Sequence, residues 1–124
     1  MNNILKTLTI ILILSLLSCN KKPDLPICIN PTDDATNITD SVLVLSWDCS
    51  DPNGDKLIFD VFLSESDEGI ITEENKIVSA TENFSCNIRN LKDNTTYYWQ
   101  VGATDQGGRF SLNAWQFTTD IIQK

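Results

Sequence analysis

The apolar and polar residues of this chain alternate in short runs from Leu25 onward, and turn-forming residues separate the runs. In the clearest of the early runs, Leu43, Leu45 and Trp47 fall on one face because side chains of a strand alternate with a period of two. No stretch here keeps apolar residues at helical spacing over three turns. The pattern therefore predicts an all-β fold.

Further runs follow the same rule. The next run places Leu57, Phe59, Val61 and Leu63 on one face and Ile58, Asp60 and Phe62 on the other. Later strands are expected near 76–79, at 84–88 with Phe84, Cys86 and Ile88 inward, at 95–105 with Tyr97, Trp99, Val101 and Ala103 together, and around Trp115 and Phe117. About seven short antiparallel strands with this turn spacing predict an immunoglobulin-like β-sandwich.

Composition restricts the function. The chain has 124 residues, enough for one domain, with 9 basic and 17 acidic residues, a net charge of −8 and no histidine. Such a charge disfavours nucleic-acid binding, which needs a clustered basic surface. The absence of histidine removes most triad and metal-hydrolase chemistry, and the carboxylates are predicted mainly in loops. We therefore expect no catalytic residues and no enzymatic activity.

The N-terminal segment has the pattern of an export signal. Lys6 precedes an apolar run at 7–17 that is too short to span a bilayer as a stable helix. The end of the run, Leu16-Leu17-Ser18-Cys19, resembles the bacterial lipobox. That resemblance implies a lipoprotein signal peptide at 1–18, cleavage before Cys19 and attachment of lipid, including palmitate, to Cys19. An ordinary secretory peptide with an incidental cysteine is the alternative.

The residues after Cys19 bear on location. Residue 20 is Asn where Asp would favour inner-membrane retention in the enterobacterial scheme, so the resemblance implies the outer membrane of a bacterial cell envelope. Lys21 and Lys22 occupy the place where some surface-exported lipoproteins carry acidic residues. The sequence therefore does not decide which leaflet of the membrane holds the lipid. We expect residues 19–25 to act as a lipidated tether, with prolines that favour an extended chain.

The remaining chain resembles a fibronectin type III domain over 26–119, followed by a short tail at 120–124. The resemblance is carried by four segments, Leu45-Ser46-Trp47, the run at 57–63, Leu91-Lys92-Asp93-Asn94-Thr95-Thr96-Tyr97, and Trp115-Gln116-Phe117-Thr118-Thr119. It implies that Tyr97 forms a tyrosine corner with backbone a few residues upstream, with Leu91 at the start of that element. Trp47 and Trp99 are expected in the core, because so small a domain needs its aromatic residues there.

Two sets of residues suggest further chemistry. Asp51, Asn53 and Asp55 alternate oxygen ligands at a spacing that calcium accepts, although Pro52 and Gly54 equally predict a plain turn capped by Asp51. No other cofactor is expected. The type III arrangement would also place Cys28 roughly opposite Cys49, so a disulfide is an option in an oxidising envelope, whereas Cys86 is expected to be a buried small hydrophobe.

One face of the predicted sandwich is a candidate contact surface. Ile58, Phe62 and Tyr98 would share the outer side of one sheet, and the loop that contains Arg109 and Phe110 offers a second contact. Alternatively, the acidic loop at 65–74 or Lys76 covers this face. We expect a non-enzymatic, lipid-anchored domain that binds an envelope or extracellular protein or glycan. The alternative is a structural spacer or accessory subunit with no ligand of its own.

Overall fold

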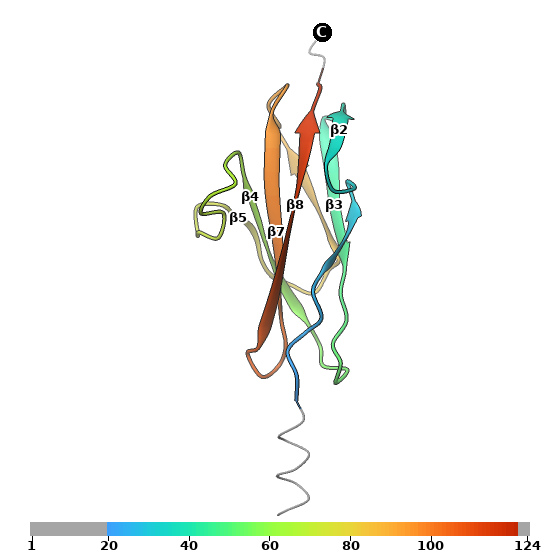
Figure 1. Ribbon diagram of the computed structural model, residues 1–124, viewed down its shortest axis with the longest axis vertical. Coiled ribbons are helices and arrows are strands. Elements are labelled where there is room, and N and C mark those ends of the chain that lie inside the picture. The colour runs from blue at the N-terminus through green and yellow to red at the C-terminus, as the bar shows by residue number, and fades with distance from the viewer. Residues whose placement is uncertain (1–19, 122–124) are drawn as a thin grey trace, which may run out of the picture.

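The computed structural model describes residues 20–121 and contains eight strands arranged as a sandwich (Figure 1). The signal-peptide prediction and Cys19 lie outside the described residues. The strands are β1 (Ile27–Asn30), β2 (Ala35–Ile38), β3 (Val42–Asp48), β4 (Ile58–Ser64), β5 (Lys76–Thr81), β6 (Ser85–Arg89), β7 (Thr96–Thr104) and β8 (Phe110–Thr119). Among residues 20–121, no helix is long and apolar enough to cross a bilayer. The predicted all-β fold is confirmed.

The strands form two sheets. One has three strands in the order β1-β3-β6, and the other has five in the order β2-β8-β7-β4-β5. All pairs are antiparallel except β2 with β8, which run parallel. The structure has one strand more than the expected seven because the chain breaks between β1 and β2 at Pro31 and changes sheets.

The core lies between the sheets and is built from the inward positions of the alternating runs. Leu45, Val61, Trp99 and Phe117 are fully buried. The rings of Trp47 and Phe59 meet edge-to-face with centroids 5.6 Å apart, and this contact joins the two sheets. The rings of Trp99 and Trp115 are tilted with centroids 4.7 Å apart, and this contact joins β7 and β8, the two longest strands. The prediction that Trp47 and Trp99 are core residues is confirmed.

The tyrosine corner is present. The hydroxyl oxygen of Tyr97 accepts a hydrogen bond from the backbone amide of Lys92 at 2.9 Å, and Leu91 is buried beside it. Asp93 continues this element and accepts the amide of Ile121 at 2.7 Å. The corner therefore ties the turn before β7 to the end of the chain's last strand.

The described part of the expected tether, which precedes β1, packs against the domain. Pro23 and Pro26 are buried, and Asp24 forms a backbone bond to Ser50 at 3.0 Å and accepts the Ser50 hydroxyl at 2.8 Å. The carbonyl of Asp24 also accepts the Ser111 hydroxyl at 2.7 Å. The segment is extended, as its prolines favour, but it is packed onto the pole formed by the β3–β4 loop and the β7–β8 hairpin (Figure 1).

The disulfide between Cys28 and Cys49 that the sequence left as an option is not formed in the structure. Residue 28 lies opposite Trp47 in the β1–β3 register, and Cys28, Cys49 and Cys86 are all free thiols. Cys28 instead donates a hydrogen bond to the carbonyl of Pro31 at 2.9 Å, and Cys49 donates to that of Asp24 at 3.3 Å. Phe84 also differs from expectation, since it precedes β6 and is 45% exposed while its ring lies against Phe59.

Candidate functional site

The outer face of the five-stranded sheet was expected to carry an exposed apolar patch, and the structure corrects that expectation at Phe62. This side chain is only 6% exposed, whereas its neighbour on the same face of β4, Ile58, is 39% exposed. The alternation along β4 is as predicted, so the difference comes from what lies over the strand.

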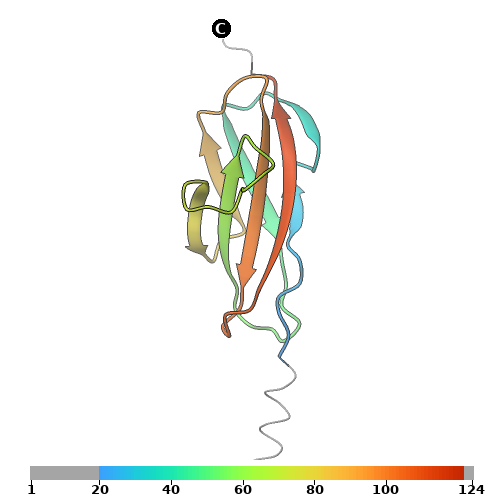
Figure 2. The ribbon, with the colours of Figure 1, turned by 60° about the vertical axis from the view of Figure 1, so that its left-hand side comes forward.

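The segment between β4 and β5 provides the cover. It folds back across the outer face of the sheet (Figure 2), and within it Ile70 is buried to 5% exposure. The ammonium of Lys76 lies 5.8 Å from the centre of the Phe62 ring, within the range of a cation–π contact. Asn75 holds the segment in shape by donating its side-chain amide to the carbonyl of Ile70 at 3.1 Å. Both covering groups considered from the sequence therefore contribute.

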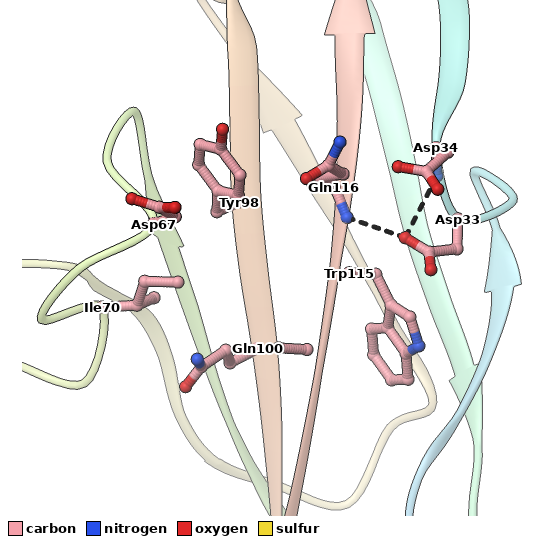
Figure 3. A pocket seen from close by; sticks show the side chains of 9 residues that line it. Asp33, Asp34, Asp67, Ile70, Tyr98, Gln100, Trp115 and Gln116 are labelled. Atoms are coloured by element: carbon pink, nitrogen blue, oxygen red, sulfur yellow. Dashed lines mark hydrogen bonds between the residues drawn. The ribbon is translucent and has the colours of Figure 1, made fainter.

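Two shallow hollows remain on this face. The first surrounds Tyr98 and Gln100 of β7 and Gln116 of β8 (Figure 3). Its rim is acidic, with Asp33 and Asp34 from the β1–β2 connection on one side and Asp67 on the other. The Asp33 carboxylate accepts the backbone amides of Asp34 at 3.0 Å and Gln116 at 3.1 Å, so that rim is fixed to the sheet.

The polar groups of the first hollow are suited to hydrogen bonding with a ligand. The side-chain oxygen of Gln100 is buried and has no hydrogen-bond partner among the described residues. An unpaired buried acceptor costs free energy, and a hydroxyl donor from a ligand would remove that cost. The half-buried ring of Tyr98 supplies an adjacent apolar surface.

The second hollow is more apolar. It is lined by Asp60, Phe62, Ile71, Gly102, Thr104, Phe110 and Leu112. Phe110 is 63% exposed and Ile71 is 53% exposed. The structure therefore brings together Phe62 and Phe110, two residues that the sequence placed in separate contact regions, while Tyr98 belongs to the first hollow.

Arg109 does not line either hollow. Its guanidinium lies 3.8 Å from the carboxylate of Asp105, at the start of the β7–β8 hairpin. Arg109 is thus placed beside the pole where the N-terminal segment packs, rather than beside Phe110's hollow.

The predicted oxygen-rich loop forms the turn expected from its sequence. The Asp51 carboxylate accepts the amides of Asn53 at 2.9 Å and Asp55 at 3.1 Å, and Gly54 adopts a φ of 72° that suits glycine. The side-chain oxygen of Asn53 accepts the backbone amide of Lys21 at 2.8 Å, and an acidic group forms around its two neighbours in the loop. That group consists of Asp51, Asp55 and Asp105, whose oxygens lie within 4.8 Å of one another. The sequence missed Asp105 because it belongs to a distant hairpin.

The three free thiols are poorly suited to nucleophilic chemistry. Burial raises the pKa of Cys28, Cys49 and Cys86 to about 11 in each case, and nearby carboxylates add to the effect at Cys28 and Cys49. These pKa values keep the thiols protonated at neutral pH.

The two-sheet topology, the tyrosine corner and the parallel β2–β8 pair define the class of immunoglobulin-like sandwich domains. Within that class, the fibronectin type III domain family matches residues 30–116, and the chain belongs to this family. Fibronectin type III domains are typically non-catalytic binding or spacer modules, and they occur as accessory domains in glycosidases.

Solved structures support the fold. The fibronectin type III domain of human fibronectin type III domain containing protein 3 is 21% identical with a TM-score of 0.57, covering 82% of this chain and 90% of that one. The PKD domain of an M14-like peptidase from a Thermoplasmatales archaeon is 19% identical with a TM-score of 0.54, covering 82% and 99%.

A third similar structure is a much larger protein. The α-L-rhamnosidase of Dictyoglumus thermophilum is 17% identical with a TM-score of 0.59 over 85% of this chain, which spans only 13% of that protein's length. Comparison with curated proteins gives no significant match.

Proposed function

We propose that this protein is a non-enzymatic, lipid-anchored domain of the bacterial cell envelope that binds a glycan through the outer face of its five-stranded sheet. The observation that carries the binding role is the first hollow, where Tyr98 lies beside Gln100 and Gln116 under an acidic rim. In its broader form, the proposal is that the same face binds a protein partner.

The chemistry of this hollow favours a sugar over an apolar ligand. Sugar rings present C–H faces that pack on an aromatic ring, and their hydroxyls both donate and accept hydrogen bonds. The Tyr98 ring and the unpaired oxygen of Gln100 provide those two complements side by side. Asp33 and Asp67 on the rim would accept further hydroxyls and disfavour anionic sugars.

The lipid anchor is supported by the sequence around Cys19 alone. The lipobox resemblance implies acylation of Cys19, and Asn20 in the next position favours the outer membrane by the same resemblance. Acyl chains on this residue would hold the protein at the bilayer, since each buried methylene contributes about 0.8 kcal/mol.

Glycan binding is tested with the purified full chain on an array of bacterial-surface and host glycans. Binding by the natural chain, and its loss in both Tyr98→Ala and Gln100→Ala, is the expected result. The matched control is Val44→Ser, which alters a side chain that is 42% exposed on the other sheet and should leave binding unchanged. Melting temperatures of all variants establish that they are folded. Absence of binding by the natural chain, or retention in both hollow variants, contradicts the proposal.

A structural spacer is the second candidate, and the cover over Phe62 favours it. Burial of Phe62, with Lys76 over its ring, removes much of the apolar surface that a protein partner would contact. A spacer predicts no glycan signal and no loss of cell-envelope function in Tyr98→Ala cells, together with a defect when the domain as a whole is deleted.

A further inference from the structure

Three carboxylates meet at the pole where the N-terminal segment packs. Asp51 and Asp55 come from the β3–β4 loop, and Asp105 comes from the start of the β7–β8 hairpin, 50 positions after Asp55. One oxygen from each lies within 4.8 Å of the others. The sheets bring the two loops to the same pole, so the fold and not the local sequence assembles the group.

The group is not a solvated acidic surface. Asp105 is 5% exposed as a residue, and its side chain is fully buried. Its Oδ1 accepts the backbone amides of Gly107 and Arg109 at 2.9 Å each, whereas its Oδ2 is buried without a hydrogen-bond partner. The unpaired oxygen belongs to the side chain that completes the group.

Asp51 repeats this arrangement from the opposite loop. Its Oδ1 accepts the amides of Asn53 and Asp55, while its Oδ2 is buried and has no hydrogen-bond partner. Each aspartate therefore uses one oxygen to shape its own loop and leaves the other unsatisfied. A buried, unpaired carboxylate oxygen is destabilising unless a cation or a hydrogen-bond donor compensates it.

Among residues 20–121, Arg109 alone forms an ion pair with a member of this group. Arg109 is the cation that pairs with Asp105, at 3.8 Å, which exceeds hydrogen-bond distance, and its side chain is 41% exposed. One partly solvated guanidinium does not balance three mutually repelling carboxylates.

We propose that Asp51, Asp55 and Asp105 bind one calcium ion. Calcium prefers carboxylate oxygens at about 2.3–2.6 Å, so two oxygens on one ion lie up to about 5 Å apart, which the observed spacing meets. Calcium also tolerates an irregular ligand set completed by water or backbone carbonyls, whereas magnesium demands near-ideal octahedral geometry. The site does not depend on what the outer sheet face binds.

The ion would join three parts of the chain at one pole. It links the β3–β4 loop to the β7–β8 hairpin, and the N-terminal segment lies against both through the Lys21–Asn53, Asp24–Ser50 and Asp24–Ser111 contacts. Asn20 also has a buried side-chain oxygen without a hydrogen-bond partner, next to the residue that binds Asn53. Calcium would therefore stabilise the position in which the chain enters the domain.

The test is calorimetric titration of the chelator-treated full chain with calcium chloride, together with melting temperatures in calcium and in chelator. We expect binding of one ion and a melting temperature several degrees higher in 2 mM calcium, because an ion that binds only the folded state stabilises it by mass action. Magnesium chloride at the same concentration should give a much smaller shift.

The main variant is Asp105→Asn, which keeps an Oδ1 acceptor for the hairpin amides and removes the charge. It should lose at least tenfold in calcium affinity and most of the calcium-dependent shift. In chelator it should melt at the same temperature as the natural chain or higher, because one repulsive charge is gone. The variant should thus melt below the natural chain in calcium but not in chelator. A misfolded variant would melt below the natural chain in both conditions. Asp51→Asn should behave in the same way.

Two further variants complete the test. Glu74→Gln removes one negative charge at an exposed position outside the group and should keep the full calcium response. Arg109→Gln removes the competing guanidinium and should raise calcium affinity several-fold. The proposal is overturned by absence of a calcium shift in the natural chain, by an equal shift in Asp105→Asn, or by an equal response to magnesium, which would remove the assignment to calcium.

Discussion

Tyr97 and Lys92 are joined by a hydrogen bond of 2.9 Å from the Lys92 backbone amide to the Tyr97 hydroxyl oxygen. The bond spans five residues and fixes the turn that leads into β7. Because the ring of Tyr97 also stacks on Phe117 with centroids 5.5 Å apart, the same side chain serves the turn and the core.

Replacement of Tyr97 by phenylalanine removes only the hydroxyl. We expect the free energy of unfolding to fall by about 1–2 kcal/mol, because the Lys92 amide loses its partner while the ring packing is kept. Chemical denaturation monitored by tryptophan fluorescence measures the change. The adjacent Tyr98→Phe is the matched control and should change stability by less than about 0.5 kcal/mol. Equal effects of the two variants would show that the corner bond contributes nothing specific.

Phe62 tests the cover over the outer sheet face. A serine at this position should destabilise the protein by about 3 kcal/mol, since the buried ring beneath Lys76 is lost. Ile58→Ser on the same face and strand should cost less than half as much, because that side chain is already 39% exposed. Denaturant midpoints with unchanged slopes provide the measurement. A Phe62→Ser variant as stable as Ile58→Ser would contradict the described cover.

The three partly buried thiols should react slowly. With pKa values of about 11, they hold roughly one hundredth as much thiolate at pH 8 as a thiol with a pKa of 9, and higher intrinsic nucleophilicity recovers only part of that difference. Alkylation by iodoacetamide in the folded state should therefore be about tenfold slower or more than in urea. Peptide mass spectrometry resolves Cys28, Cys49 and Cys86. Rapid labelling of any one at pH 8 would contradict its burial.

The same pKa values set a pH dependence. The folded state holds these protons more tightly than the unfolded chain, whose thiols titrate near pH 9. Their contribution to stability is therefore complete below pH 9 and is lost as the pH rises toward 11. The natural protein should therefore lose stability between pH 9 and 11 relative to Cys28→Ala, which lacks this thiol. The difference between their free energies of unfolding should shrink over that range.

Acylation of Cys19 predicts the behaviour of the chain in cells. The natural protein should partition into the detergent phase and start at a lipid-modified Cys19 by mass spectrometry, whereas Cys19→Ala should lose the lipid. Protease treatment of intact and permeabilised cells then distinguishes the two leaflets. Recovery of an unmodified cysteine at the mature N-terminus would favour an ordinary secretory peptide.

The sequence was sufficient for the fold because its information is local. Alternation in the run at 57–63 predicted which side chains of β4 face inward, and the segment from Leu91 to Tyr97 predicted the corner. Phe62 shows the limit of such reasoning, since alternation gives the face of a sheet but does not show that the segment between β4 and β5 folds back across that face (Figure 2).

The candidate sites depended more on contacts between distant residues. Asp51 and Asp55 were visible as a spaced pair, but Asp105 joins them only through the pairing of β4 with β7. The sequence also did not show that the side chain of Asn53 accepts a hydrogen bond from the N-terminal segment. The register of β1 against β3 was likewise not visible in the sequence. Trp47, and not Cys49, lies opposite Cys28.

The parallel pair of β2 and β8 has a mechanical consequence. The segment before β1 and the end of β8 lie at opposite poles (Figure 1), so a pull on these two ends acts nearly along the strands. The bonds from Asp34 to Gln116 and from Asp120 to Ile38, at 3.0 and 2.9 Å, bracket this pair. Force in that direction loads them in shear, all at once, instead of peeling them apart one after another. A domain held to a membrane at one pole and pulled at the other would therefore resist extension at this seam first.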